Sequence, residues 1–284
     1  MLKLCANLKW LFTEVPLLDR FEAAARAGFE AVEYPTPYEQ PVATLRARLN
    51  GHGLKMVLIN TPAGERSRGE QSGLACLPDR RDAFRDDLRK GLDYAAGLGC
   101  GLLHLQAGIL PADVSRDRGW ATYLANVIWA AELASTAGVR LALEPINQVD
   151  IPGFLLRTQE EGAAVVEAVG PDKAGLQFDI YHCQVEQGSV SRRMQALLPI
   201  IAHIQVADSP GRNEPGTGEI NWEHMFGLIE RLGYSGWIGC EYTPRHGSAE
   251  GLVWRDRFGA LNDAPIPPPG ACPAALPAAS RPGP

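Results

Sequence analysis

Four apolar segments of the chain end on a polar side chain that can bind a metal or move a proton. These polar residues are Glu144, Asp179, Gln205 and Glu241. Burying an unpaired carboxylate costs several kcal/mol, so a Glu at the inner end of an apolar strand needs a partner, a metal or a chemical task. Pro145 follows the first of them and has no N–H with which to continue strand pairing.

Three carboxylates and one amide oxygen form an all-oxygen ligand set. Such a set favours Mg²⁺ or Mn²⁺, whereas zinc favours more His or Cys. An octahedral ion held by these four groups keeps two open positions, which adjacent carbonyl and hydroxyl oxygens of a substrate would fill. A metal that polarises the carbonyl stabilises an enediolate, and flanking carboxylates can remove and return a proton. The residues therefore predict aldose–ketose isomerisation or epimerisation.

Each of these side chains also has a structural interpretation. A single Glu at a strand end is more often a salt-bridge partner or a helix cap than a catalyst. Four such residues in successive strands favour a functional site instead. His104 and His203 are interpreted as core histidines with satisfied hydrogen bonds. Asp208 is expected to cap or orient the loop that follows it.

Short apolar strands alternate with amphipathic helices along the chain, which indicates a parallel sheet. Eight such units in about 250 residues predict a single closed (β/α)8 barrel of the TIM type, with its active site at the carboxyl ends of the strands. An open doubly wound sheet is the alternative, but no Gly-x-Gly-x-x-Gly sequence follows an early strand. Strands are expected at 2–8, 31–34, 55–60, 102–108, 141–144, 174–179, 201–208 and 237–242. Helices are expected at 19–28, 41–51, 82–99, 119–138, 191–198, 222–232 and 249–257, with one more after a capping box of Thr158 and Glu161.

Composition limits the classes of function. The chain has 284 residues, a net charge of −6, 45% hydrophobic and 21% charged residues. These values are ordinary for a soluble globular protein, and the acidity argues against a nucleic-acid partner. No apolar run approaches the roughly 20 residues of a membrane span, and the N-terminus lacks a signal-peptide pattern. We expect a cytoplasmic protein without a membrane partner, whose six cysteines contain no Cys-x-x-Cys pair and stay reduced. A homo-oligomer is left open.

Two segments differ from the rest of the chain. The barrel domain is expected to occupy residues 1–258, and the Pro/Ala-rich segment 259–284 is predicted to be a disordered tail. A long polar connection runs through 61–80, and loops of this length are usually functional lids or disordered.

The strand-end motifs resemble the hydroxypyruvate isomerase family, which belongs to the xylose-isomerase-like barrels and includes 2-oxo-tetronate isomerases. The resemblance covers about residues 1–258 and rests on a combination of motifs more specific than any one of them. The segments that carry it are Ala6–Leu8, Leu143–Asn147, Asp150–Phe154, Phe178–His182, His203–Asp208, Glu214–Asn221 and Trp237–Tyr242.

The resemblance implies reversible conversion of hydroxypyruvate to 2-hydroxy-3-oxopropanoate (tartronate semialdehyde). It implies that Glu144 and Glu241 donate and accept the proton, and that these two, Asp179 and Gln205 bind Mg²⁺ or Mn²⁺. Related sugar epimerases usually have His at the position of Gln205, so this residue favours the hydroxypyruvate branch.

The resemblance also implies residues that bind the substrate, a small anionic hydroxy-oxo acid. His182 matches a substrate-side His, and Arg212 lies in a loop where it can meet substrate oxygens, as an anionic substrate requires. Asn60, at the end of the third strand, and Glu70, in the long connection, are further candidates for substrate binding.

Alternative functions stay open at this point. The connection at 62–73 departs from the family pattern: it is one residue longer and lacks a Trp. A 2-oxo-tetronate to 3-oxo-tetronate isomerase therefore remains an alternative, because motifs at the metal do not separate the two substrates. A sugar epimerase, a metal-dependent hydrolase of the same fold and a non-catalytic binder are further alternatives.

Overall fold

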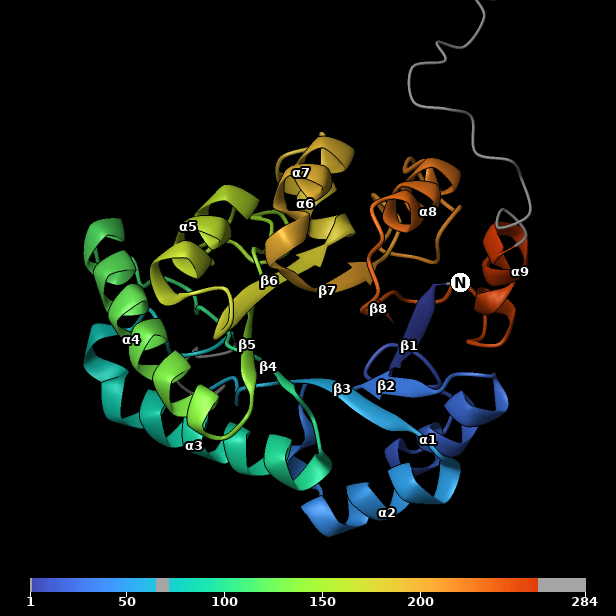
Figure 1. Cartoon of the computed structure of the whole chain (residues 1–284), viewed down its shortest axis with the longest axis horizontal. Helices are drawn as coiled ribbons and strands as arrows, with labels where there is room; N and C mark the ends of the chain where they lie inside the picture. The colour runs from blue at the N-terminus through green and yellow to red at the C-terminus, as the bar shows by residue number, and fades with distance from the viewer. Residues whose placement is uncertain (1, 65–71, 260–284) are drawn as a thin grey trace, which may run out of the picture.

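The protein folds as a closed parallel barrel surrounded by helices (Figure 1). The computed structural model describes residues 2–64 and 72–259. The strands are β1 (Lys3–Asn7), β2 (Ala31–Glu33), β3 (Lys55–Asn60), β4 (Leu102–His104), β5 (Arg140–Leu143), β6 (Ala174–Asp179), β7 (Ile201–Val206) and β8 (Trp237–Cys240). They pair in sequence order, and β8 pairs with β1 to close the barrel, with Cys5 opposite Gly239. The predicted TIM barrel is therefore confirmed, and the open-sheet alternative is wrong.

Helices lie outside the ring of strands in the view down the barrel (Figure 1). They are α1 (Leu17–Arg26), α2 (Val42–His52), α3 (Arg81–Leu98), α4 (Arg116–Thr136), α5 (Gln159–Val169), α6 (Ile180–Glu186), α7 (Val190–Leu197), α8 (Trp222–Arg231) and α9 (Trp254–Gly259). The inner faces of these helices cover strands that are themselves buried, as in β6, where all residues are buried. This double burial explains the uniformly apolar strands of the sequence.

Local capping explains several helix boundaries. Thr158 and Glu161 form the predicted capping box, in which each side chain accepts a hydrogen bond from the other residue's backbone N–H. The helix predicted at 119–138 begins three residues earlier at Arg116, because the side chain of Ser115 accepts a hydrogen bond from the backbone N–H of Arg118 and caps it. The last helix, predicted as 249–257, is divided into a 3-10 turn at Glu250–Leu252 and α9.

One helix was not predicted. The α6 helix follows β6 without a connecting loop, because Asp179 is both the last residue of the strand and the N-cap of the helix. Its Oδ1 accepts hydrogen bonds from the backbone N–H of Tyr181 at 2.7 Å and of His182 at 3.3 Å. This short helix brings His182 back over the end of the strand that carries Asp179.

Some predicted ends of elements need correction, and others stay predictions. The strands β7 and β8 end at Val206 and Cys240, so Glu241 is the first residue after its strand. The predicted tail, 259–284, lies outside the described residues except for Gly259, which ends α9, and the proposed domain boundary stays a prediction.

None of the helices in the described ranges is long and apolar enough to cross a membrane.

Candidate active site

The polar residues singled out in the sequence gather at the carboxyl ends of β5 to β8. Glu144 follows β5, Asp179 ends β6, Gln205 lies in β7 and Glu241 follows β8. All four are buried, and the most exposed of them, Glu241, has only 9% of its surface accessible. Parallel strands bring their carboxyl ends to one rim of a barrel, so residues far apart in the sequence share a small volume.

Arg212 is the cation nearest to these carboxylates in the described part of the chain. Its Nη2 lies 2.7 Å from Glu241 Oε2 and 3.6 Å from Asp179 Oδ2. Its guanidinium lies between the rings of Trp10, at 4.8 Å, and Tyr181, at 5.1 Å. Two aromatic faces and the two carboxylates therefore hold the cation in place. The backbone of Arg212 has φ of 50°, a left-handed conformation that is unusual for a residue other than glycine.

Asp208 builds the loop that carries Arg212. It is buried, and its carboxylate accepts hydrogen bonds from the backbone N–H groups of Ser209, Gly216, Gly218 and Ile220, at 2.8 to 3.1 Å. The prediction that Asp208 orients the following loop is therefore confirmed.

The hydrogen bonds of His182 define its tautomer. The Oδ1 of Asn147 accepts from the backbone N–H groups of Val149 and Asp150, at 3.0 and 2.8 Å, so its amide nitrogen points away from them. That nitrogen donates to His182 Nδ1 at 2.6 Å. Burial lowers the pKa of His182 well below its usual value, with Arg212 adding to the effect. The ring is therefore neutral with its proton on Nε2.

The Nε2–H of His182 faces the carboxylates. It lies 3.8 Å from Glu144 Oε1 and 3.7 Å from Asp179 Oδ2. On the other side of Glu144, the Nδ1 of His104 lies 3.5 Å from Oε2. Burial lowers the pKa of His104 to about 3, so it is a neutral neighbour that supplies no charge.

The carboxylates of Glu144, Asp179 and Glu241 are buried and repel one another. Burial, then the charges of Glu241 and Asp179, raise the pKa of Glu144 well above its usual value. Burial raises the pKa of Asp179 to about 7, although Arg212 opposes the shift. The pKa of Glu241 is also raised by burial, against the same arginine. A group that holds several carboxylates under these conditions attracts a proton or a cation.

The donor set fits a divalent cation. Glu144 Oε1 and Asp179 Oδ2 are buried oxygens without a hydrogen-bond partner in the described structure. Ligand atoms of Glu144, Asp179 and His182 lie within 4.8 Å of one another, but the proton on Nε2 makes His182 a hydrogen-bond donor beside the two carboxylates and not a ligand. The two other predicted ligands have partners: Glu241 binds Arg212, and Gln205 Oε1 accepts from Gln177 Nε2 at 2.6 Å. An amide oxygen has a second lone pair, so Gln205 keeps a position for a cation.

The sequence analysis missed a buried carboxylate beneath this group. Glu33, the last residue of β2, is 1% exposed and accepts a hydrogen bond from His203 Nε2 at 2.6 Å. Burial alone would raise its pKa, but His203 and hydrogen bonds from Gln205 and Asn7 lower it below the usual value. The signal was present, because β2 also ends on a carboxylate. His203 is a core histidine as predicted, with Glu33 as its partner.

The two remaining predictions of substrate binding concern Asn60 and Glu70. Asn60 ends β3 at the same rim, in register with His104, and its backbone carbonyl accepts from the hydroxyl of Tyr38. Glu70 lies outside the described residues. Both assignments stay predictions.

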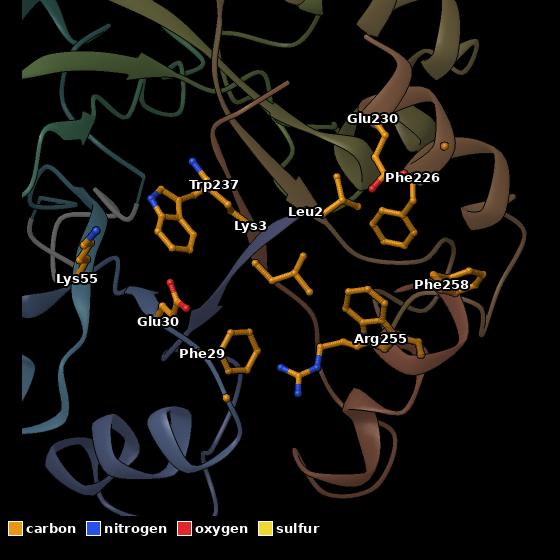
Figure 2. Close-up of a pocket in the computed structure, with 14 residues that line it drawn as sticks. Leu2, Lys3, Phe29, Glu30, Lys55, Phe226, Glu230, Trp237, Arg255 and Phe258 are labelled. Atoms are coloured by element: carbon orange, nitrogen blue, oxygen red, sulfur yellow. The ribbon is translucent and has the colours of Figure 1, made fainter. Parts of the chain in front are cut away.

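A separate cavity of about 600 Å³ lies at the opposite end of the barrel (Figure 2). Its lining includes the first residues of β3 and β8, Lys55 and Trp237, together with aromatic side chains such as Phe29 and Phe226. Because the carboxylates lie at the other ends of the strands, this cavity is not part of the candidate active site.

Comparison with known proteins agrees with the fold. A model of the xylose isomerase-like TIM barrel family matches residues 21–261. A 2-oxo-tetronate isomerase of Cupriavidus necator is 45% identical over 89% of this chain and 97% of its own. The hydroxypyruvate isomerase of Escherichia coli is 40% identical over 91% of this chain and all of its own.

Solved structures share the architecture. A Brucella melitensis structure described as an AP endonuclease of family 2 matches with a TM-score of 0.87 and 36% identity, over 91% of this chain and 99% of its own. The chain belongs to the xylose isomerase-like TIM barrel family. Within that family it groups with the hydroxypyruvate and 2-oxo-tetronate isomerases.

Proposed function

We propose that this enzyme interconverts a 2-oxo-3-hydroxy acid and the corresponding 2-hydroxy-3-oxo acid through an enediolate. The observation that carries this proposal is the group of buried carboxylates, Glu144, Asp179 and Glu241, beside a fixed arginine at the rim of the barrel. Relatives at 40 and 45% identity that carry the names of such isomerases support it.

Glu144 and Glu241 are the groups proposed to move the proton. One removes the proton from the hydroxyl-bearing C3 of the substrate, and the other delivers a proton to C2. The hydroxyl proton on the C3 oxygen moves to the C2 oxygen. Overall, one hydrogen moves from C3 to C2 and one from the C3 oxygen to the C2 oxygen. The two carboxyl groups differ in their surroundings, because Arg212 donates to Glu241 at 2.7 Å and no cation in the described structure lies as close to Glu144.

Three other residues are proposed to hold the substrate. Arg212 offers its guanidinium to the substrate carboxylate, and His182 offers its Nε2–H to an oxygen on C2 or C3. Asn60, the last residue of β3 and in register with His104, is proposed to contact the substrate from the β3 side.

The proposed cofactor is Mg²⁺ or Mn²⁺, held by Glu144, Asp179, Gln205 and Glu241. When bound, such an ion supplies Lewis-acid polarisation of the carbonyl and offsets negative charge on neighbouring oxygens. The buried oxygens of Glu144 and Asp179 that lack partners support this assignment.

Hydroxypyruvate is the proposed primary substrate, supported by the hydroxypyruvate isomerase of Escherichia coli at 40% identity. Gln205, at the position where related epimerases carry His, argues against an epimerase and does not separate hydroxypyruvate from the four-carbon acid. A four-carbon 2-oxo-tetronate is the second candidate, favoured by the relative from Cupriavidus necator at 45% identity. Both acids carry the same reacting atoms and differ only in the group beyond C3.

Steady-state turnover of both acids with Mg²⁺ tests the proposal. We expect the wild-type chain to convert one or both, and expect Glu144→Gln and Glu241→Gln each to lower kcat by at least about 100-fold, the typical contribution of a general acid or base. Glu167→Gln, the same change at an exposed position of α5, serves as the control and should keep most of the activity. Near-normal kcat in both Gln variants would contradict the assignment, and conversion of the four-carbon acid alone would change the substrate but keep the mechanism.

A further inference from the structure

A layer of buried polar side chains lies directly beneath the carboxylate group. At its centre is Glu33, which accepts hydrogen bonds from three nitrogen donors. These are His203 Nε2 at 2.6 Å, Asn7 Nδ2 at 2.8 Å and Gln205 Nε2 at 2.9 Å. All four side chains are at most 1% exposed. A carboxylate that accepts this many hydrogen bonds is fixed in position.

Two side chains of this layer, Gln205 and Asn7, connect it to the proposed metal site and proton-transfer residues. Gln205, a proposed metal ligand, directs its amide nitrogen at Glu33, so its oxygen points away from Glu33. Asn7 shares its amide nitrogen between Glu33 Oε1 and Glu241 Oε1, at 2.8 and 3.0 Å. The Oδ1 of Asn7 accepts from the backbone N–H of Lys9 at 3.0 Å, which fixes the direction of this amide independently.

The barrel makes room for this layer. A Cβ atom added to Gly239 would lie 2.5 Å from both carboxylate oxygens of Glu33. The glycine two residues before Glu241 therefore leaves the space that the carboxylate occupies.

We infer that Glu33, held by His203, is a positioning residue for the active site. As a pure hydrogen-bond acceptor it fixes the direction of the Gln205 amide together with Gln177, whose Nε2 donates to Gln205 Oε1. The N–H of Gln205 is thereby turned to Glu33, and the amide oxygen, with its second lone pair, is the atom left for the cation. Asn7, whose amide nitrogen donates to both carboxylates, links Glu33 to one oxygen of Glu241. This inference rests on the proposed function, because it assigns Gln205 and Glu241 their roles there.

Geometry argues against a second metal site in this layer. Cys5, Glu33 and His203 offer ligand atoms within 4.8 Å of one another, but the 2.6 Å between His203 Nε2 and Glu33 is a hydrogen-bond distance. The Sγ of Cys5 lies 3.6 Å from Glu33 Oε2 as a donor, and a metal would need that thiol deprotonated. The carboxylate of Glu33 is therefore already satisfied by hydrogen bonds within the layer.

The test compares Glu33→Gln with Glu33→Asp and uses Cys5→Ala as the control. In Glu33→Gln, an NH₂ group replaces one of the two oxygens that accept hydrogen bonds from the surrounding donors. The side-chain amide of Gln205 or Asn7 must therefore rotate or lose its hydrogen bond to residue 33. Asp keeps the acceptor but is shorter by one methylene. Cys5→Ala removes a different contact to the same carboxylate and leaves both amides untouched.

Mn²⁺ alone is the probe, titrated into each folded variant at 25 °C by electron paramagnetic resonance, with kcat and KM measured in parallel. We expect Glu33→Gln to weaken Mn²⁺ binding by roughly 10- to 100-fold, the usual effect of losing the partner of a metal ligand. Its kcat should fall more than its KM changes, Glu33→Asp should be intermediate, and Cys5→Ala should match the wild type.

The outcomes separate this inference from the proposed function. Mn²⁺ affinity within twofold of the wild type in both Glu33 variants overturns the inference, even if their melting temperatures fall, because a merely structural role would change stability alone. If Glu33→Gln does not fold, Glu33→Asp decides by the same criterion. A wild-type chain that neither binds Mn²⁺ nor turns over either acid refutes the proposed function itself.

Discussion

Substitution of Gly239 by alanine tests how tightly the carboxylate of Glu33 packs against strand β8. The added methyl would lie 2.5 Å from both carboxylate oxygens of Glu33, and an ordinary contact begins near 3.4 Å, so the atoms must separate by roughly 0.9 Å. Neither side yields easily. Glu33 is held by three buried donors, and Gly239 is in register with Cys5 on β1 and Gln205 on β7.

The expected cost follows from these constraints. Overpacking of a well-filled core costs about 1–3 kcal/mol, and loss of one hydrogen bond to a charged group costs about 1.5–3 kcal/mol. We therefore expect Gly239→Ala to lower the free energy of unfolding by about 3 kcal/mol, or to lower Tm by about 6–12 °C for a chain of this size.

Urea unfolding monitored by circular dichroism measures this effect, with Gly101→Ala as the matched control. A Cβ at Gly101 meets no atom within 4 Å, and the residue has no positive φ, so this change should stay within about 0.5 kcal/mol of the wild type. A Gly239→Ala protein as stable as the Gly101→Ala protein would refute the tight packing of Glu33 beneath Gly239.

Three further predictions concern pH, a loop contact and the arginine. The pKa of Asp179 in the folded protein is about 7, above that of an unfolded Asp, so the free energy of unfolding of the metal-free protein should fall as the pH rises from about 4 to 7. Added Mg²⁺ should reverse this trend, and Asp179→Asn should flatten it. Urea unfolding with and without a chelator measures both effects. Ser248→Ala removes the acceptor of the buried Phe12 N–H, at 2.5 Å, and a donor to Glu14, so it should cost about 1–3 kcal/mol in the same assay; an unchanged midpoint would contradict this. Arg212→Lys keeps the charge but loses the flat contact with two rings and the forked geometry, so KM for hydroxypyruvate should rise by about tenfold or more in steady-state kinetics, and an unchanged KM would argue against a substrate role.

The barrel itself was predictable from the sequence because its signals are local. Uniformly apolar strands, helix stop signals and the capping box at Thr158 each need only neighbouring residues. The carboxylates Glu144, Asp179 and Glu241 were found for the same reason, since a strand that ends on an acid is visible in the chain.

The parts that were missed depend on contacts between distant strands. Glu33 ends a strand of only three residues, and its direction follows from the register of β2 with β1 and β3, which no local pattern determines. The rings on either side of Arg212 come from Trp10 and Tyr181, which the sequence does not connect. The α6 helix was missed because it begins directly at Asp179, so one residue carries both the strand-end signal and the N-cap signal.

Deuterium incorporation is the most direct test of the proposed chemistry. The chain is incubated with Mg²⁺ and hydroxypyruvate in D₂O, and the reaction is followed by proton NMR. Proton transfer through Glu144 and Glu241 predicts that the 2-hydroxy-3-oxopropanoate formed carries solvent deuterium at C2, the carbon next to the carboxylate, and that recovered hydroxypyruvate gains deuterium at C3. Conversion at a normal rate with no deuterium at either carbon would contradict the enediolate mechanism, because the hydrogen would then move directly between the carbons without reaching a carboxylate.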